Sequence, residues 1–118
     1  MKTQNIFKLN VQEPYLSYIR DGIKTIEGRL NKGKFKELSV GDLLEIESIV
    51  ENFRVIEKNE YKTFLEMVNT EGFENVIPDK KTAIDAANIY YKFFTKDQEK
   101  KFGVVAIKIE KIDRKSVV

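Results

Sequence analysis

The order of strands and helices that the sequence predicts is the feature that most limits its possible folds. Apolar residues alternate with polar ones at both ends of the chain and in its middle, which predicts strands, and helical spacing predicts helices between them. The expected order is strand, helix, two or three strands, two helices and a final strand. Because helices do not alternate regularly with strands, a doubly wound parallel sheet is disfavoured. We therefore expect an α+β fold, with an antiparallel sheet or small barrel and helices on its rim.

Five segments are predicted to be strands: residues 5–11, 25–30, 43–50, 53–58 and 104–112. The last is the clearest, because Val105, Ile107 and Ile109 line one face. Lys108 and Glu110 point the other way. The third and fourth strands are expected to pair antiparallel through the short turn between them.

Helices are predicted between these strands. Pro14, at the first helical position, begins a short helix that Gly22 ends in a left-handed conformation. The spacing i, i+3, i+4, i+7 predicts a second helical face, formed by Tyr61, Phe64, Leu65 and Val68. A third helix begins at Thr82, which forms a capping box with Asp85 in place of the usual glutamate. The remaining segments are a basic loop at 31–37, a polar turn or short helix at 95–101, and a frayed tail at 113–118.

Length and charge set the broad class of the protein. The 118 residues predict one domain over residues 1–118, with a core at about 5–112. The chain has 21 Lys and Arg against 19 Asp and Glu, and this net charge of +2 is too small to predict nucleic-acid binding by itself. No apolar run approaches the length of a membrane span, and the first residues are unlike a signal peptide. We therefore expect a cytoplasmic protein without a membrane partner.

The absence of cysteine and histidine excludes much of enzyme chemistry. Disulfides, thiolate nucleophiles, histidine bases and Cys or His metal sites are all impossible. Catalysis would have to use carboxylates, lysine, tyrosine, serine or threonine. The acidic residues Asp42, Glu45 and Glu47 are typical of the wet face of a strand, so we expect no metal and no cofactor.

The segment at residues 22–29 brings Lys24, Glu27 and Arg29 together between a predicted helix and a predicted strand. Strand alternation would place Thr25, Glu27 and Arg29 on one face. One interpretation is structural: Glu27 forms an ion pair with Arg29 or Lys24. The other is a polar cleft. There Arg29 holds a phosphate or stacks on a base, Lys24 contacts a phosphate or carbonyl, and Glu27 accepts from a base amino group.

The pattern Gly-x-Lys-x-x-Glu-x-Arg at residues 22–29 resembles the signature of ASCH domains. The segment Leu-Ser-Val-Gly-Asp at 38–42, followed by a strand, is also similar to that family, as is the ending Gly-Val-Val-Ala-Ile at 103–107. The resemblance spans roughly residues 5–112. It implies a PUA-like β-barrel, mostly antiparallel, with about five to six strands and rim helices. It also implies a cleft that binds RNA or a nucleotide-like ligand, with a role in RNA metabolism or transcription-related regulation.

The same resemblance admits a hydrolase as the alternative function. Some small bacterial members resemble amidohydrolases acting on N4-acetylcytidine, and others resemble ribonucleases. In the amidohydrolases a lysine, a threonine and a later glutamate are the working residues. Lys24 matches the lysine, Glu71 or Glu74 is nearest to the glutamate, and Glu27 stands where the threonine would be. This departure favours binding over hydrolysis, and the candidate catalytic residues are Lys24, Glu27 and Glu71.

The basic loop supplies further candidate ligand-binding residues. Lys32, Lys34 and Lys36 surround Phe35, a pattern that can hold a phosphate backbone and stack a base. A solvated surface loop explains the same pattern. The binding residues implied by the segment and the loop are Lys24, Thr25, Glu27, Arg29, Lys32, Lys34, Phe35 and Lys36. The tyrosines at 61, 90 and 91 are expected in the core, with one hydroxyl able to reach the cleft.

Overall fold

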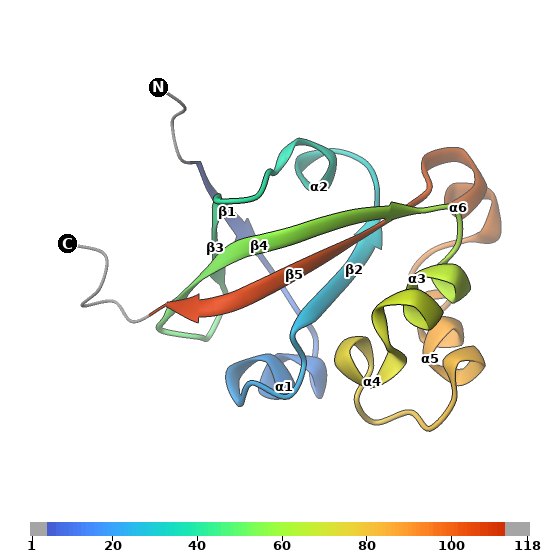
Figure 1. Cartoon of the computed structure of the whole chain (residues 1–118), viewed down its shortest axis with the longest axis horizontal. Helices are drawn as coiled ribbons and strands as arrows, with labels where there is room; N and C mark the ends of the chain where they lie inside the picture. The colour runs from blue at the N-terminus through green and yellow to red at the C-terminus, as the bar shows by residue number, and fades with distance from the viewer. Residues whose placement is uncertain (1–4, 113–118) are drawn as a thin grey trace.

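The computed structural model describes residues 5–112, and these form an α+β fold. The strands in this part of the chain are β1 (Ile6–Leu9), β2 (Ile26–Leu30), β3 (Leu43–Ile46), β4 (Asn52–Tyr61) and β5 (Val104–Ile112). The helices are α1 (Tyr15–Arg20), α2 (Lys34–Glu37), α3 (Phe64–Glu71), α4 (Phe73–Val76), α5 (Ala83–Tyr90) and α6 (Lys96–Phe102). Figure 1 shows α3, α4 and α5 gathered at one end of the molecule, with α1 and α2 on opposite sides of the strands.

The strands form one sheet in the order β1-β3-β4-β5-β2. Only β1 and β3 pair in parallel, and the other pairs are antiparallel, as expected. The predicted pairing of the third and fourth strands is confirmed, since Leu43 lies opposite Arg54. Strand β4 is longer than predicted and pairs with β5 over almost its full length, so the two form the long ribbon that crosses Figure 1.

The two edge strands of this sheet, β1 and β2, come close to each other. Arg29 of β2 donates from Nη2 to the carbonyl oxygen of Asn10, just beyond β1, at 2.7 Å. Lys34 of α2 donates to the carbonyl oxygen of Lys8, which lies in β1. The sheet is therefore strongly curled, and side chains bridge its two edges. Closure into a barrel through strand-to-strand hydrogen bonds stays a prediction.

The sheet has a hydrophobic core on each face. On one face, Val104 and Ala106 of β5 pack with Phe64, Met67 and other residues of α3, α4 and α5. On the other face, alternate residues of β5 pack inside the curl with α1 and the other strands. The predicted bounds of β5 are confirmed. Its second face, however, is apolar rather than polar up to Ala106, because the helices cover it.

Several local predictions need correction. Tyr61 is the last residue of β4 and not part of a helix, because Thr63 caps α3 by accepting from the Glu66 N–H. The predicted strand at 43–50 ends at Ile46, and Ser48 has a positive φ of 73°. The expected loop at 31–37 contains the single turn α2. The short helix α4 was not predicted.

Other predictions of helix ends hold. Gly22 follows α1 with a φ of 79°, as expected, although Pro14 is the N-cap and not the first helical residue. Thr82 caps α5 by accepting from the Asp85 N–H. The segment 95–101 resolves as the helix α6, which opens with a full capping box of Thr95 and Gln98. The predicted tail at 113–118 lies outside the described residues.

A buried carboxylate on α6 holds three helical segments together. Oε2 of Glu99 accepts from the backbone N–H of Phe64, the first residue of α3, at 2.7 Å. The hydroxyl of Tyr91, just after α5, donates to both oxygens of Glu99 at 2.9 and 2.8 Å. Burial, and then this carboxylate, raise the pKa of Tyr91 to about 12. Glu99 therefore satisfies polar groups from two neighbours at once.

We predict that Glu99→Ala lowers the free energy of unfolding by about 2–4 kcal/mol, because it leaves the buried Phe64 N–H and the partly buried Tyr91 hydroxyl without a partner. Glu99→Gln keeps an acceptor of similar size and should lose less than half as much. Urea denaturation followed by circular dichroism measures both. Equal losses in the two variants would contradict this role.

Candidate functional site

Lys24 is buried in the turn that leads into β2, with only 1% of its side chain exposed. Its ammonium group donates to the carbonyl oxygens of Ile26 at 2.6 Å and Val76 at 2.5 Å. It also lies 3.2 Å from Oε1 of Glu27. The three protons of the ammonium group thus have three acceptors. Lys24 ties the start of β2 to the end of α4.

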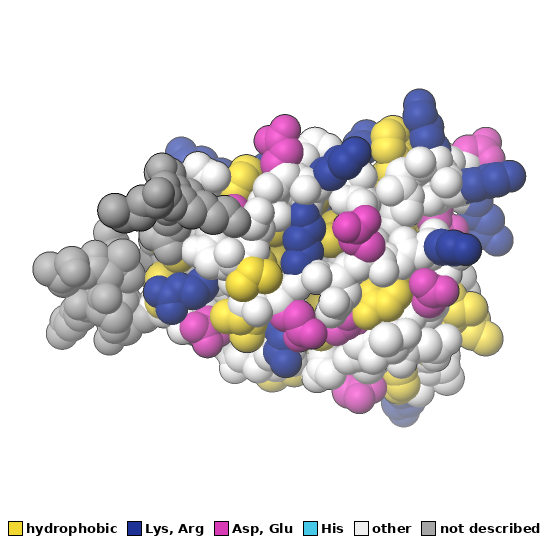
Figure 2. All heavy atoms as spheres, turned by 45° about the horizontal axis from the view of Figure 1, so that its top comes forward, with side chains coloured by type: hydrophobic (Ala, Val, Ile, Leu, Met, Phe, Trp, Pro, Cys, Tyr) yellow, Lys and Arg dark blue, Asp and Glu magenta, His cyan; other side chains and the backbone are white. Residues whose placement is uncertain are grey.

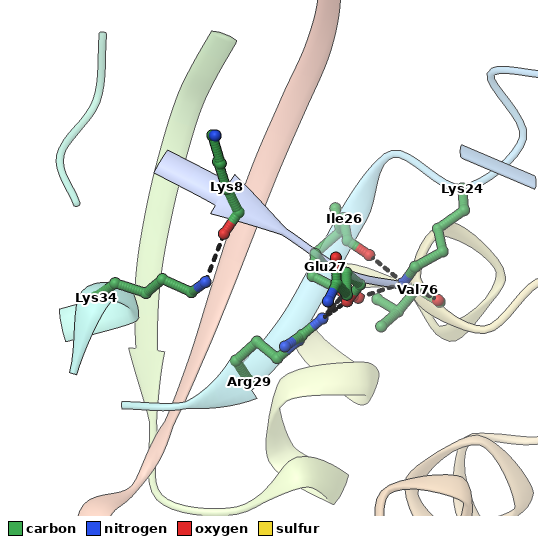
Figure 3. Close-up of polar contacts among 8 residues, drawn as sticks. Lys8, Lys24, Ile26, Glu27, Arg29, Lys34 and Val76 are labelled. Carbon is green, nitrogen blue, oxygen red and sulfur yellow. Dashed lines mark hydrogen bonds and ion pairs between the residues drawn. The ribbon is translucent and has the colours of Figure 1, made fainter. Parts of the chain in front are cut away.

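Glu27 lies between Lys24 and Arg29, as Figure 3 shows. Its Oε1 faces Lys24, and its Oε2 accepts from Nε and Nη2 of Arg29 at 3.2 and 2.9 Å. The guanidinium group of Arg29 also packs over the ring of Phe35, 4.8 Å from its centroid. The Arg29 side chain remains 23% exposed, and its Nη1 donates to none of the described residues. The Lys24 end of this charge network is therefore buried, and the Arg29 end is partly exposed to solvent.

Burial and the neighbouring charges act in opposite directions on the pKa values of Glu27 and Lys24. Burial alone would raise the pKa of Glu27, but Lys24 and Arg29 outweigh it, so this pKa is lowered. Burial lowers the pKa of Lys24, and Glu27 only partly opposes that change. Arg29 adds to the lowering because it is also positive. Glu27 is thus held as a carboxylate.

A pocket of about 180 Å³ adjoins this network. Its polar lining consists of Lys24, Glu27, Gly28 and Arg29 together with Asn10 and Gln12, and Asn10 is bonded to Arg29 through its carbonyl. The apolar residues that complete its wall are Val11, Tyr15, Ile77, Ile89, Tyr90, Phe93 and Phe94. The pocket therefore combines one polar strand with a largely aromatic lining.

The polar strand is the free edge of the sheet. Thr25 and Asn31 bond toward β5, whereas the carbonyl of Ile26 points away from it and accepts from Lys24. Because the backbone groups of an antiparallel strand alternate in direction, the N–H and C=O of Gly28 also point away from β5. Gly28 lines the pocket, and the Tyr90 hydroxyl lies beside its backbone N–H.

Tyr90 places a buried hydroxyl beside Gly28. A Cβ atom at position 28 would lie 2.7 Å from this oxygen and 2.5 Å from the Met67 side chain, so only glycine fits. The hydroxyl has no hydrogen-bond partner of normal geometry among the described residues. Burial raises its pKa well above the usual value, with Glu27 adding to the rise and the nearby Gly28 N–H opposing it in part. It therefore stays protonated and can donate.

Tyr15 lies on the same pocket wall. Burial, and then the negative charge of Asp79, raise the pKa of Tyr15 to about 12. Its ring thus contributes an uncharged aromatic surface at neutral pH.

The structure separates the predicted site residues into three groups. Lys24, Glu27 and Arg29 meet at the pocket. Lys32, Lys34 and Phe35 line a neighbouring hollow, which also contains Arg29. The remaining three, Thr25, Lys36 and Glu71, line neither of these hollows.

Two residues of the third group, Thr25 and Glu71, have structural partners elsewhere, and Lys36 is exposed on α2. The Thr25 N–H donates to the Asn75 carbonyl. The Glu71 carboxylate accepts from Tyr61 and from Asn59, on the β4 side of α3. Glu74 is exposed on α4. In this structure Glu71 therefore pairs with β4, apart from the Lys24 network.

Sequence reasoning missed most of the aromatic wall. Tyr90 lines the pocket with its hydroxyl buried beside Gly28, whereas the hydroxyls of Tyr61 and Tyr91 bond to Glu71 and Glu99. Phe93 and Phe94 line the pocket and were not predicted. The run Tyr-Tyr-Lys-Phe-Phe at 90–94 holds more aromatic residues than one helical face can bury, and that excess was the available signal.

Neither a membrane-spanning helix nor an acidic metal site lies within residues 5–112. None of the helices in residues 5–112 is long and apolar enough to cross a membrane. No group of three or more acidic residues in the same range could hold a metal ion. Asp42, for example, accepts from the N–H groups of Asn5 and Ser39.

One protein-family model matches this chain, and several solved structures resemble it. The family model of the ASCH domain matches residues 9–113. The crystal structure of the archaeal hypothetical protein PH0355 shares 37% identity with a TM-score of 0.85, covering 91% of this chain and 99% of that one. The solution NMR structure of protein PF0455 from Pyrococcus furiosus shares 36% identity with a TM-score of 0.78, covering 92% and 98%. No curated protein matches the sequence.

We predict that Lys24→Met lowers the free energy of unfolding by about 3–5 kcal/mol, because it removes one partner of a buried ion pair and leaves two carbonyls unpaired. Arg54→Met breaks the exposed pair with Glu110 and should change stability by less than about 1 kcal/mol. Urea denaturation of the two variants makes the comparison. Similar losses in both would contradict a structural role for Lys24.

We predict that the ionised Glu27 side chain makes the free energy of unfolding decrease as the solution becomes acidic. Its folded pKa lies below the ordinary value of 4.5, so the unfolded chain takes up a proton first as the pH falls. The stabilisation is present above that value and is lost as the pH falls through the folded pKa. The free energy of unfolding should therefore drop more steeply below about pH 5 in the wild type than in Glu27→Gln. Glu110→Gln, in the exposed pair, should keep the wild-type slope, and a wild-type slope in Glu27→Gln would refute the prediction.

Proposed function

The chain belongs to the ASCH domain family, and on this premise we propose that its pocket binds RNA or a nucleotide-like ligand. The observation behind the proposal is the combination of an aromatic wall with the free backbone edge of β2 in one pocket of about 180 Å³. Such a pocket suits a flat, uncharged ring with polar atoms along one side. A nucleobase has that chemistry.

The size and lining of the pocket support a ring as ligand. A cavity of about 150 Å³ in another protein admits a benzene ring, so a pocket of this volume admits one six-membered ring with substituents. Tyr15, Phe93 and Phe94 supply aromatic surface against which a base can stack. Phe93 is 52% exposed, which places it at the mouth of the pocket.

The polar groups of the pocket support a base edge as the part recognised. Gly28 lines the pocket with a C=O that points away from β5, and the Tyr90 hydroxyl, buried beside it, is a donor without a partner among the described residues. Bases present donors and acceptors side by side on their edges. A hydrogen bond from a ligand would also satisfy the Tyr90 hydroxyl, which is otherwise costly to bury.

Arg29 supports a phosphate at the mouth of the pocket. Glu27 and Asn10 fix its position, and its free Nη1 adds donors on the exposed side. A fixed guanidinium group with unused donors is well suited to a phosphate oxygen. A nucleotide would thus have its base inside and its phosphate outside.

Hydrolysis, with Lys24 and a carboxylate as working groups, is the alternative. We rank it second because the Lys24 ammonium group already donates to three acceptors and because both oxygens of Glu27 face cations. A general base needs a lone pair that can reach the substrate proton. Release of acetate from N4-acetylcytidine by the purified protein would reverse this ranking.

Two tyrosines provide a matched test of the binding proposal. We expect one of the four ribonucleoside 5′-monophosphates, or a ribohexamer of the same base, to bind the wild type in calorimetric titration. Tyr90→Phe should weaken that binding by about 1–3 kcal/mol without lowering the free energy of unfolding, since its buried hydroxyl lacks a partner whose loss would destabilise the fold. Tyr91→Phe should do the opposite, because its hydroxyl bonds to Glu99 away from the pocket.

Two results would count against the proposal. One is the absence of binding by any of these probes to the folded wild type. The other is an unchanged affinity in Tyr90→Phe for a probe that does bind.

A further inference from the structure

We propose that the ligand is a single-stranded polynucleotide, which leaves the pocket past Arg29 and continues over a second hollow beside α2. This inference rests on the proposed function and specifies the class of ligand. We call the second hollow the exit groove; it is lined by Arg29, Leu30, Lys32, Gly33, Lys34, Phe35 and Phe94.

The exit groove adjoins the pocket. Arg29 and Phe94 line both hollows, so a ligand that passes between these two side chains stays in contact with the protein. The groove follows the chain from the end of β2 into α2. Strand β2 rises about 3.3 Å per residue, so Glu27 to Leu30 spans about 10 Å, and Lys32 lies beyond the strand in a turn where its N–H donates to the Leu30 carbonyl. Lys32 and Lys34 therefore lie farther along the chain than the β2 residues that line the pocket.

The lysines of the exit groove are available for phosphates. Lys32 and Lys34 are both exposed. The ion pairs among the described residues involve other cations, namely Arg20, Lys24, Arg29, Arg54, Lys80 and Lys111. Lys34 also donates to the Lys8 carbonyl, which holds its ammonium group in place beside the sheet. Lys32 and Lys34 therefore form no ion pair with a carboxylate of the described residues, whereas Arg29 of the same groove is paired with Glu27.

Aromatic rings accompany these lysines. Lys34 lies 5.6 Å from the ring centroid of Phe35, on which Arg29 also packs. Lys32 lies 5.0 Å from the centroid of Phe102, and Lys101 of α6 lies 5.2 Å from the same centroid. Figure 2 shows further Lys and Arg side chains at the end of the molecule that bears α6. Alternating cations and rings are the usual surface for single-stranded nucleic acid.

The geometry favours a single strand over both alternatives. A duplex keeps its bases stacked and paired, so it cannot place one ring in a pocket of this size without flipping it out. A free mononucleotide would contact the pocket and Arg29 but leave Lys32 and Lys34 unused. A strand uses all of these features, because its base enters the pocket while its next phosphates reach the lysines.

The test compares one nucleotide with a strand of the same base. The probes are the ribonucleoside 5′-monophosphate that binds best, its ribohexamer, and a twelve-base-pair RNA duplex. We expect the hexamer to bind at least about tenfold more tightly than the mononucleotide, since each further phosphate adds contacts within one ligand. We expect the duplex to bind more weakly than the hexamer.

Charge-matched variants locate the strand. Lys32→Ala/Lys34→Ala should remove the higher affinity of the hexamer over the mononucleotide. The fall of log K with log salt should also become shallower by about 1.4, or about 0.7 for each phosphate contact. Its affinity for the mononucleotide should not change. Arg54→Ala/Lys111→Ala removes two charges that are paired elsewhere and should retain the wild-type gain and slope. Lys32→Ala alone, which disturbs no backbone contact, replaces the double variant if that one folds poorly.

The outcomes separate this inference from the proposed function. Equal affinity for mononucleotide and hexamer, or tighter binding of the duplex, would overturn the inference while leaving a nucleotide-binding pocket. An equal loss of hexamer affinity in both double variants would also overturn it. Absence of binding by every probe would instead overturn the proposed function itself.

Discussion

The buried carboxylate of Glu27, held between two cations, is the interaction on which the rest of this structure depends. Charges this far from water persist only when they are paired and hydrogen-bonded. Lys24 meets that condition on one side and reaches the end of α4 through Val76, while Arg29 meets it on the other and reaches the end of β1 through Asn10. Lys24, Glu27 and Arg29 thereby hold α4, β2 and the end of β1 in fixed positions relative to one another.

This arrangement explains how an edge strand can line a pocket. Free edges invite pairing with other chains, and proteins usually cover or disrupt them. In β2 the Lys24 ammonium group covers the first outward carbonyl, and the aromatic wall faces the backbone of Gly28. Because position 28 has no Cβ atom, the Tyr90 hydroxyl and the Met67 side chain pack directly against its backbone. The protected edge thus becomes a polar surface in an otherwise apolar hollow.

Much of the fold was predictable because local patterns govern it. The strand at 104–112, the caps at Thr82 and Thr95, and the left-handed Gly22 follow from alternation, hydrogen-bonding side chains and glycine's freedom. The errors arose where tertiary contacts override the pattern. Tyr61 fits a helical face by spacing, yet pairing with Val104 in β5 keeps it in β4. Val104 and Ala106 are buried because α3 to α5 cover a face that alternation alone would leave to solvent.

For the site, the sequence by itself determined which groups can act. Without histidine or cysteine, the charges of residues 24–29 were the foremost candidates, and their signature identified the ASCH domain family that the comparisons show. Only the tertiary structure decided the arrangement of those groups. In the folded chain the Lys24 ammonium group is buried among three acceptors, and Glu71 pairs with residues of β4. Tyr90 of α5 packs against Gly28 of β2. Spacing along the chain specifies which side chains share an element, whereas burial and hydrogen-bond partners depend on elements that meet only when the whole chain has folded.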